Sequence, residues 1–117
     1  MSREELLSIK EEAEKIYVHP LINGYLADIV LATRKQEKVV MGVSPRGTLA
    51  FVRASQGYAM VRGREYVVPE DIKAVAVPVL AHRLSLSAGA DMRRSAEQVI
   101  EDIISSITLP TEDWSGR

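Results

Sequence analysis

The stretch Gly42-Val43-Ser44-Pro45-Arg46-Gly47 begins a long predicted helix in this 117-residue chain. Ser44 is a good N-cap, because its hydroxyl can accept a hydrogen bond from a first-turn N–H, and Pro45 suits the first helical position. Arg46 then falls at the positive end of the helix dipole, where Asp or Glu would be favoured, at a cost of about 0.3–1 kcal/mol. An anion such as phosphate would offset this cost, since free N–H groups, the dipole and a guanidinium fork would converge on it.

Arg46 also has ordinary interpretations: it is a solvated surface arginine, or it pairs with a carboxylate of the acidic N-terminal segment. Arg53 lies two turns further along the same face and is either solvated or extends a basic strip toward a neighbouring subunit. His82 and Arg83 are either favourable charge at a helix C-terminus or part of an interface. Ser44 lacks a nearby base, so we interpret it as a cap and not as a nucleophile.

Helical periodicity extends upstream of this turn. Ser2 and Glu5 form a capping-box pattern for a helix through about Lys15, with apolar residues at helical spacing that predict a core-facing side: Leu6, Ile9, Ala13 and Ile16. A second helix follows His19-Pro20 and has a strong amphipathic stripe, formed by Leu21, Ile22, Tyr25, Leu26, Ile29 and Val30. The polar run 33–38 predicts the end of that helix and a solvated loop.

Three further helices are predicted from the Ser-Pro-Arg turn onward. The helix that starts there ends at Gly63, and its apolar face contains Leu49, Val52, Ala59 and Met60. Pro69-Glu70-Asp71 starts a fourth helix, with proline at the first position and acids in the first turn. A capping-box pattern at Ser95 predicts a fifth helix through about Ile107.

Two short β-prone patches, residues 16–18 and 64–68, lie between the predicted helices. They could pair as a two-stranded clip, which would depend on helix packing for its stability. The predicted fold is therefore mainly α, a bundle of about five helices with a possible short two-stranded β clip. Residues 1–109 form this helical domain, and residues 110–117 form a loosely ordered tail.

Composition narrows the classes of function. The net charge is −1 and the pI is near 6.1, which argues against a nucleic-acid binder driven by bulk charge. The chain has no cysteine, and its two histidines lie far apart without clustered acids, so we predict no metal site. It has no secretory signal and no apolar run of about 20 residues. We therefore predict a cytoplasmic chain with no nucleic-acid partner and no membrane insertion.

Taken in order, these motifs resemble the C-terminal lid of MoxR-type AAA+ ATPases. The residues that match are Gly42-Val43-Ser44-Pro45-Arg46 with the helix through Arg62-Gly63-Arg64, then Tyr66-Val67-Val68-Pro69-Glu70-Asp71-Ile72-Lys73 and Leu80-Ala81-His82-Arg83-Leu84. The resemblance extends from about Glu4 to Ile107, nearly the whole chain. Each motif alone is weak, but together they are specific.

The resemblance implies a helical lid packed against a nucleotide-binding α/β core, in a protein that assembles into homo-oligomeric, hexameric rings. It implies that Arg46 is the second sensor, a catalytic residue that reaches the terminal phosphate of ATP. Arg46, Ser44 and Pro45 are then the expected nucleotide-binding residues, with Ser44 and Pro45 holding the helix end in place. The resemblance also implies a chaperone-like role that couples nucleotide state to lid motion, often alongside proteins with von Willebrand factor A domains.

The chain departs from the family pattern in three places. Val68 stands where a capping Thr or Ser is usual, so the fourth helix should start less firmly. Gly47 stands where Ala is common, which should loosen the first turn by ~1 kcal/mol relative to Ala. The 117 residues contain no Gly-x-x-x-x-Gly-Lys-Ser/Thr phosphate loop and no paired-acid magnesium motif. The core that would hold magnesium is thus missing, and we expect no ATP bound to this chain alone.

Two interpretations account for the missing core. The chain is a fragment of a longer ATPase, which the helix cap at Ser2 favours, or it is a standalone protein that kept only the lid. The main alternative function is a helical protein-interaction adaptor without nucleotide chemistry, in which Arg46 would be dispensable. A nucleic-acid module is a third hypothesis, disfavoured by net charge, that would use the arginines at positions 46, 53, 62, 64, 83, 93 and 94.

Overall fold

The computed structural model describes residues 2–35, 39–83, 85–86, 92–108 and 113–116. In these residues it has five α-helices, which are α1 (Arg3–Glu14), α2 (Pro20–Lys35), α3 (Pro45–Val61), α4 (Pro69–Leu80) and α5 (Met92–Ser106). A 3-10 turn, η1 (Ala81–Arg83), follows α4, and the short strands β1 (Val39–Met41) and β2 (Ser85–Leu86) pair antiparallel. The mainly helical fold predicted from the sequence is confirmed.

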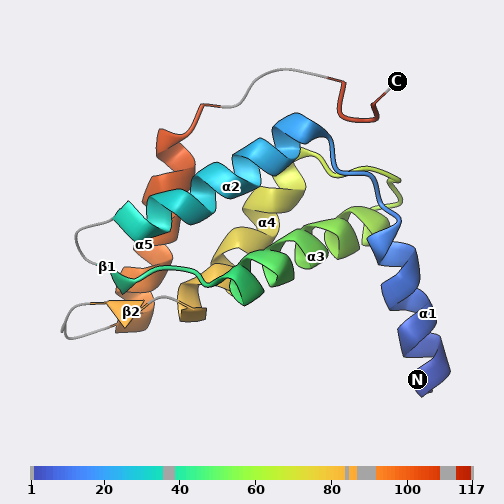
Figure 1. Ribbon diagram of the computed structural model, residues 1–117, viewed down its shortest axis with the longest axis horizontal. Helices are drawn as coiled ribbons and strands as arrows, with labels where there is room; N and C mark the ends of the chain where they lie inside the picture. Colours follow the sequence, from blue (N-terminus) through green and yellow to red (C-terminus); the bar gives the residue numbers. More distant parts are fainter. Residues whose placement is uncertain (1, 36–38, 84, 87–91, 109–112, 117) are drawn as a thin grey trace.

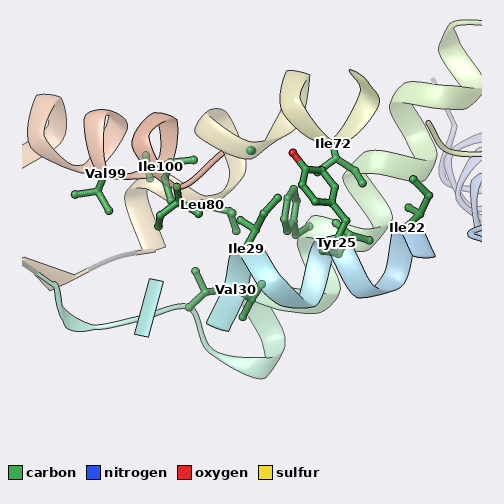
Figure 2. Packing of buried hydrophobic residues seen from close by; sticks show 14 of the residues in the cluster. Ile22, Tyr25, Ile29, Val30, Ile72, Leu80, Val99 and Ile100 are labelled. Carbon is green, nitrogen blue, oxygen red and sulfur yellow. The ribbon is translucent and has the colours of Figure 1, made fainter. Parts of the chain in front are cut away.

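Helices α2 to α5 enclose the core. In Figure 1, α2 and α3 run in opposite directions, and α4 packs against both α3 and α5. Figure 2 shows apolar side chains from α2, α4 and α5 meeting in one cluster. The largest fully buried members of this core are Ile22, Ile29, Phe51, Ile72, Leu80, Ile100 and Ile103.

Tyr25 is a polar exception within this core. Its side chain is only 4% exposed, and its hydroxyl, which Figure 2 shows directed toward α4 beside Ile72, has no hydrogen-bond partner in the described part of the chain. Burial raises the pKa of Tyr25, and the negative charge of Glu70 raises it further. The phenol therefore stays neutral and fills space in the core.

Helix α1 lies outside the core. It contacts α3 and projects away from the rest of the bundle (Figure 1), and none of its residues is buried. Leu6 is 59% exposed and Ile9 is 42% exposed, so the prediction of a core-facing side is wrong for these two residues, whereas Ile16, just after the helix, packs against the core. Leu49 on α3, predicted to be inward, is also exposed. Apolar spacing predicts an amphipathic helix, but it does not identify what covers the apolar face.

The capping side chains decide where the helices begin. Ser2 Oγ accepts a hydrogen bond from the Glu5 N–H at 3.1 Å, and Ser44 Oγ accepts one from the Gly47 N–H at 3.1 Å, as predicted. The predicted start at Ser95 is wrong, because α5 already begins at Met92. Methionine and arginine are good helix formers, so the helix continues upstream of the capping pattern.

The two β-prone patches meet, but they form only an isolated bridge and not a pair of strands. The Tyr17 N–H donates to Glu65 O at 2.9 Å and the Val67 N–H donates to Tyr17 O at 2.9 Å, which makes a single parallel bridge between Tyr17 and Tyr66. The antiparallel strand pair instead joins β1 and β2, which the sequence patterns did not predict.

The C-terminal segment packs near the start of α2. The Trp114 and His19 rings lie edge to face with centroids 5.5 Å apart. Gly116 has φ +78° and approaches Tyr17 so closely that an added Cβ would lie 2.7 Å from the ring. Of the tail predicted to be loosely ordered, residues 110–112 and 117 lie outside the described residues, and residues 113–116 are those that reach these rings.

Candidate functional site

Arg46 is the second residue of α3, next to Pro45. Its side chain is exposed and forms no hydrogen bond or ion pair with any residue that the structure describes. Helix α1 lies beside the opposite, C-terminal part of α3 (Figure 1). Pairing of Arg46 with a carboxylate of that acidic helix, one of the ordinary interpretations, is therefore excluded, and the guanidinium is available to a ligand.

The backbone at the start of α3 offers one further donor. Pro45 has no N–H, and the Gly47 N–H is used by Ser44 Oγ. The Thr48 N–H donates to Ser44 O at 2.9 Å. Among the described contacts the Arg46 N–H therefore has no acceptor. An uncapped N–H at the positive end of a helix is a favourable position for an anion.

Two other arginines lie at this end of α3. Arg34 Nη2 donates to Val43 O at 3.0 Å, and the side chain of Arg83 passes close to Gly47. Within the described ranges, neither of them nor Arg46 forms an ion pair with a carboxylate. Uncompensated positive charge therefore gathers around the start of α3, where an anion could neutralise it.

Gly47 is buried and has no space for a side chain. An added Cβ would lie 2.8 Å from Val43 Cγ1 and 3.1 Å from Arg83 Cδ. The expectation that alanine would suit this position better is therefore wrong here. The glycine lets the first turn of α3 approach η1 closely.

The last turn of α2 holds the chain that leads into Ser44. Thr33 is fully buried, and its Oγ1 accepts a hydrogen bond from the Val43 N–H at 3.2 Å. Helix α2 ends at Lys35, within the polar run 33–38 as predicted, but Thr33 is buried and not solvated, and residues 36–38 of the predicted loop lie outside the described residues. A signal existed in the sequence, because Thr33 continues the buried stripe of α2 three and four residues after Val30 and Ile29.

Arg53 does not extend the site. Its Nε lies 3.8 Å from Glu14 Oε1, and its Nη1 donates to Gln56 Oε1 at 2.9 Å. Gln56, which is 4% exposed, in turn donates to Ile16 O at 2.9 Å. These residues attach the end of α1 to α3, so no basic strip runs from Arg46 through Arg53.

His82 and Arg83 end the turn that follows α4. His82 is exposed, and Arg83 Nε donates to Val79 O at 3.1 Å, a carbonyl of the last helical turn. This supports the interpretation of Arg83 as favourable charge at a helix C-terminus. The closeness of its side chain to Gly47 also places it beside Arg46, which the sequence patterns did not reveal.

A partly buried ion pair follows the C-terminal end of α3. After Gly63, whose φ is +78°, Arg64 pairs with Asp71 Oδ1, and Asp71 Oδ2 accepts a hydrogen bond from the Val68 N–H at 2.9 Å. Burial raises the pKa of Asp71, although the Val68 N–H and Arg64 both act to lower it. This carboxylate stabilises the start of α4, where Val68 supplies no side-chain cap.

In the part of the chain that the structure describes, no group of three or more His, Asp or Glu residues is arranged to hold a metal ion. No helix there combines the length and the apolar character needed to cross a membrane.

Comparison with protein families and with curated proteins gives consistent matches. Residues 31–103 match the family model of the AAA lid domain. The chain is 33% identical, over its whole length, to the uncharacterized protein YeaC of Bacillus subtilis (strain 168), of which it covers 37%. It is 37% identical over 94% of its length to Chaperone MoxR1 of Mycobacterium tuberculosis, of which it covers 32%. It is 44% identical over 59% of its length to Protein MoxR of Paracoccus denitrificans. The chain thus spans about a third of the length of the first two relatives.

One solved structure supports the same relationship. A crystal structure from Cytophaga hutchinsonii, described as a candidate ATPase, is 27% identical and superposes with a TM-score of 0.80. The match covers 95% of this chain and 37% of that protein. The helical arrangement described above is therefore similar to one part of a larger protein.

Proposed function

We propose that Arg46 contacts the terminal phosphate of ATP. The premise is that this chain belongs to the AAA lid domain family and is the lid of a MoxR-type AAA+ ATPase. The contact would form when the lid closes on a nucleotide-binding core outside the 117 residues. It would couple nucleotide state to lid motion in a chaperone-like ring. Ser44 and Pro45 would fix the helix end from which Arg46 projects.

The exposed, unpaired guanidinium of Arg46 is the observation that supports this proposal most strongly. A positive side chain in the first helical turn is unfavourable without an anion. The free Arg46 N–H and the nearby Arg34 and Arg83 make the same surface attractive to phosphate. Among the described residues no carboxylate occupies the position that phosphate would take.

The proposed chemistry needs little from the lid beyond charge and position. Phosphoryl transfer is catalysed mainly by aligning the groups and by neutralising charge on the transferred phosphoryl. A guanidinium is suited to this, because it bonds two phosphate oxygens at once and remains charged at physiological pH. Since Arg46 is on the lid, it would reach the phosphate only in the closed state, so ATP would favour closure. Hydrolysis would remove that preference and release the lid.

The nucleotide-binding core and the other subunits and partners would be supplied from outside these 117 residues. The α/β core would supply the phosphate loop and hold magnesium, since neither motif occurs in the 117 residues. We further propose a homo-oligomeric, hexameric ring, cytoplasmic localisation, and partners with von Willebrand factor A domains. These follow from resemblance to the MoxR family, and the lid residues alone do not specify them.

The direct test is ATP turnover of the full-length ATPase with Arg46→Ala. We expect kcat to fall about 100-fold, as when one oxyanion-stabilising donor is removed, while the thermal unfolding midpoint of the lid is unchanged. Arg46→Lys should also be impaired, because an ammonium group cannot reproduce the two-pronged contact.

Arg62→Ala is the matched control. Arg62 is another exposed arginine at the other end of α3, with its guanidinium carbon 6.0 Å from the centroid of the Tyr58 ring. Turnover should be unaffected by this substitution. Equal turnover in Arg46→Ala and the wild type would remove Arg46 from the nucleotide site.

The adaptor is a second candidate function, favoured by the exposed apolar residues of α1. Leu6, Leu7 and Ile9 are 59%, 47% and 42% exposed, and another protein body could cover them. If adaptor binding is the only function, Leu6→Ser should abolish partner binding while Arg46→Ala has no effect on any measured activity. The turnover measurement above therefore also separates the two candidates.

A further inference from the structure

We infer that Thr33 and Arg34 at the end of α2 are positioning residues for Arg46, an inference that rests on the proposed function. They act on Val43, the residue directly before the Ser44 cap. Through Val43 they would set the position of the Ser-Pro-Arg turn relative to α2. Thr33 acts only through Val43, whereas Arg34 also adds positive charge to this surface.

Both backbone polar groups of Val43 are bound by α2. Its N–H donates to Thr33 Oγ1 at 3.2 Å, and its carbonyl accepts from Arg34 Nη2 at 3.0 Å. Val43 is 1% exposed, so water cannot readily replace these bonds. A buried backbone group that loses its partner is destabilised, which holds this residue at one place on α2.

Thr33 is itself fixed in orientation. Its hydroxyl donates to Val30 O at 2.6 Å, and a hydroxyl has only one hydrogen to donate. The oxygen therefore acts as the acceptor for Val43. Threonine is β-branched and restricted in χ1, and the side chain is fully buried. The acceptor is thus held rigidly on α2.

Gly42 brings the chain close enough for these bonds to form. An added Cβ at this position would lie 2.7 Å from Arg34 Cγ and 2.9 Å from Thr33 Oγ1. The added Cβ would also lie 3.1 Å from Arg34 Cα, a backbone atom of α2. Any side chain here would push the segment away from α2 and break the contact with Val43. We call the set Thr33, Arg34, Gly42 and Val43 the α2 clamp.

Val43, the last residue of the α2 clamp, lies three residues before Arg46. Ser44 and Pro45 then lead directly into α3, so displacement of Val43 would displace the first turn of that helix. Errors of about 1 Å in the placement of a catalytic group can lower rates 100-fold. Loss of the clamp should therefore reduce turnover while leaving the guanidinium of Arg46 chemically intact.

The first test is Thr33→Val in the full-length ATPase, which keeps the shape but removes the hydroxyl. We expect kcat to fall about tenfold, and Thr33→Ser, which restores the acceptor, to recover most of the activity. In an Arg46→Ala background, Thr33→Val should have no further effect on kcat. A purely structural role would instead lower kcat by the same factor in both backgrounds, and that result would overturn the inference.

Arg34→Met is the second test, for the case that Thr33→Val does not fold. The Arg34 side chain is exposed, so its replacement should be tolerated. It should lower kcat by a larger factor when Arg46 is present than in the Arg46→Ala background, because only the loss of its positive charge acts in both. Amide hydrogen exchange of Val43 in the 117-residue chain gives an independent readout, with faster exchange expected in Thr33→Val.

The outcomes separate this inference from the proposed function. If Arg46→Ala lowers turnover but both clamp variants behave like the wild type, the inference is wrong and the sensor role of Arg46 stands. If Arg46→Ala has no effect, the proposed function fails and the positioning role fails with it.

Discussion

Two arginines near opposite ends of α3, Arg46 and Arg64, are in opposite situations. Arg64, just beyond the C-terminal end, pairs with Asp71, a carboxylate with 0% exposure. Arg46, in the first turn, is exposed and has no partner among the described residues. One arginine fastens α3 to α4, and the other projects from the bundle.

The difference distinguishes a structural charge from one that is kept for a ligand. A buried carboxylate needs its cation, because an unpaired charge in the interior is strongly unfavourable. An arginine at a helix N-terminus gains nothing from its own protein, since the dipole opposes it. Its presence there is explained if an anion from outside the chain completes the site. The same residue type thus serves folding at one end of α3 and, we propose, phosphate recognition at the other.

The largest expected difference in stability comes from replacing each arginine by methionine. Arg64→Met should lower the free energy of unfolding of the chain by about 3 kcal/mol, because it leaves Asp71 buried without its partner. Arg46→Met should leave that free energy unchanged or raise it by about 0.5 kcal/mol, since a charge unfavourable to the dipole is removed. Urea denaturation of both variants is the measurement. Equal losses would mean that Arg46 is also a structural residue.

A smaller effect tests the close packing at the start of α3. Gly47→Ala should lower the free energy of unfolding by about 1 kcal/mol, because crowding against Val43 outweighs the helix propensity of alanine. Gly57→Ala is the matched control on the same helix, where an added Cβ has no atom within 4 Å. That control should be more stable than the wild type by about 0.5–1 kcal/mol. Stabilisation by both substitutions would show that the first turn has more space than the structure indicates.

The smallest effect concerns the start of α4, next to the Arg64 pair. Val68→Thr would add the side-chain cap that this helix lacks, and we expect a gain in unfolding free energy of about 0.5 kcal/mol. Ser44→Ala, which removes the existing cap of α3, should lower it by about 1 kcal/mol. Thermal unfolding of both variants measures these changes. A loss on Val68→Thr would indicate that Asp71 already satisfies the helix start fully.

Local patterns in the sequence predicted much of the fold. The caps at Ser2 and Ser44, the stop at Gly63 and the proline start of α4 all depend on residues within one helical turn. The helix start predicted at Ser95 was wrong, because a capping pattern can also lie inside a helix whose upstream residues are good helix formers. The exposed face of α1 was not predictable, because periodicity does not report whether a covering surface belongs to the same chain.

The candidate site likewise contains one feature that the sequence predicted and several contacts that it did not. Arg46 was predictable from its conflict with the helix dipole, which involves only adjacent residues. The contacts of Thr33 and Arg34 with Val43 join positions about ten residues apart, and the approach of Arg83 to Gly47 joins positions still farther apart. Such contacts follow from how the helices pack. Thr33 could have been suspected as a polar residue on a buried stripe, but its partner could not.

The most direct test of the account is the affinity of the full-length ATPase for ATP and for ADP, with and without Arg46→Ala. The account predicts about tenfold weaker ATP binding in the variant, the loss of one charge-assisted contact, with ADP binding unchanged because ADP lacks the terminal phosphate. Equal effects on ATP and ADP, or no effect on either, would contradict the claim that Arg46 recognises that phosphate.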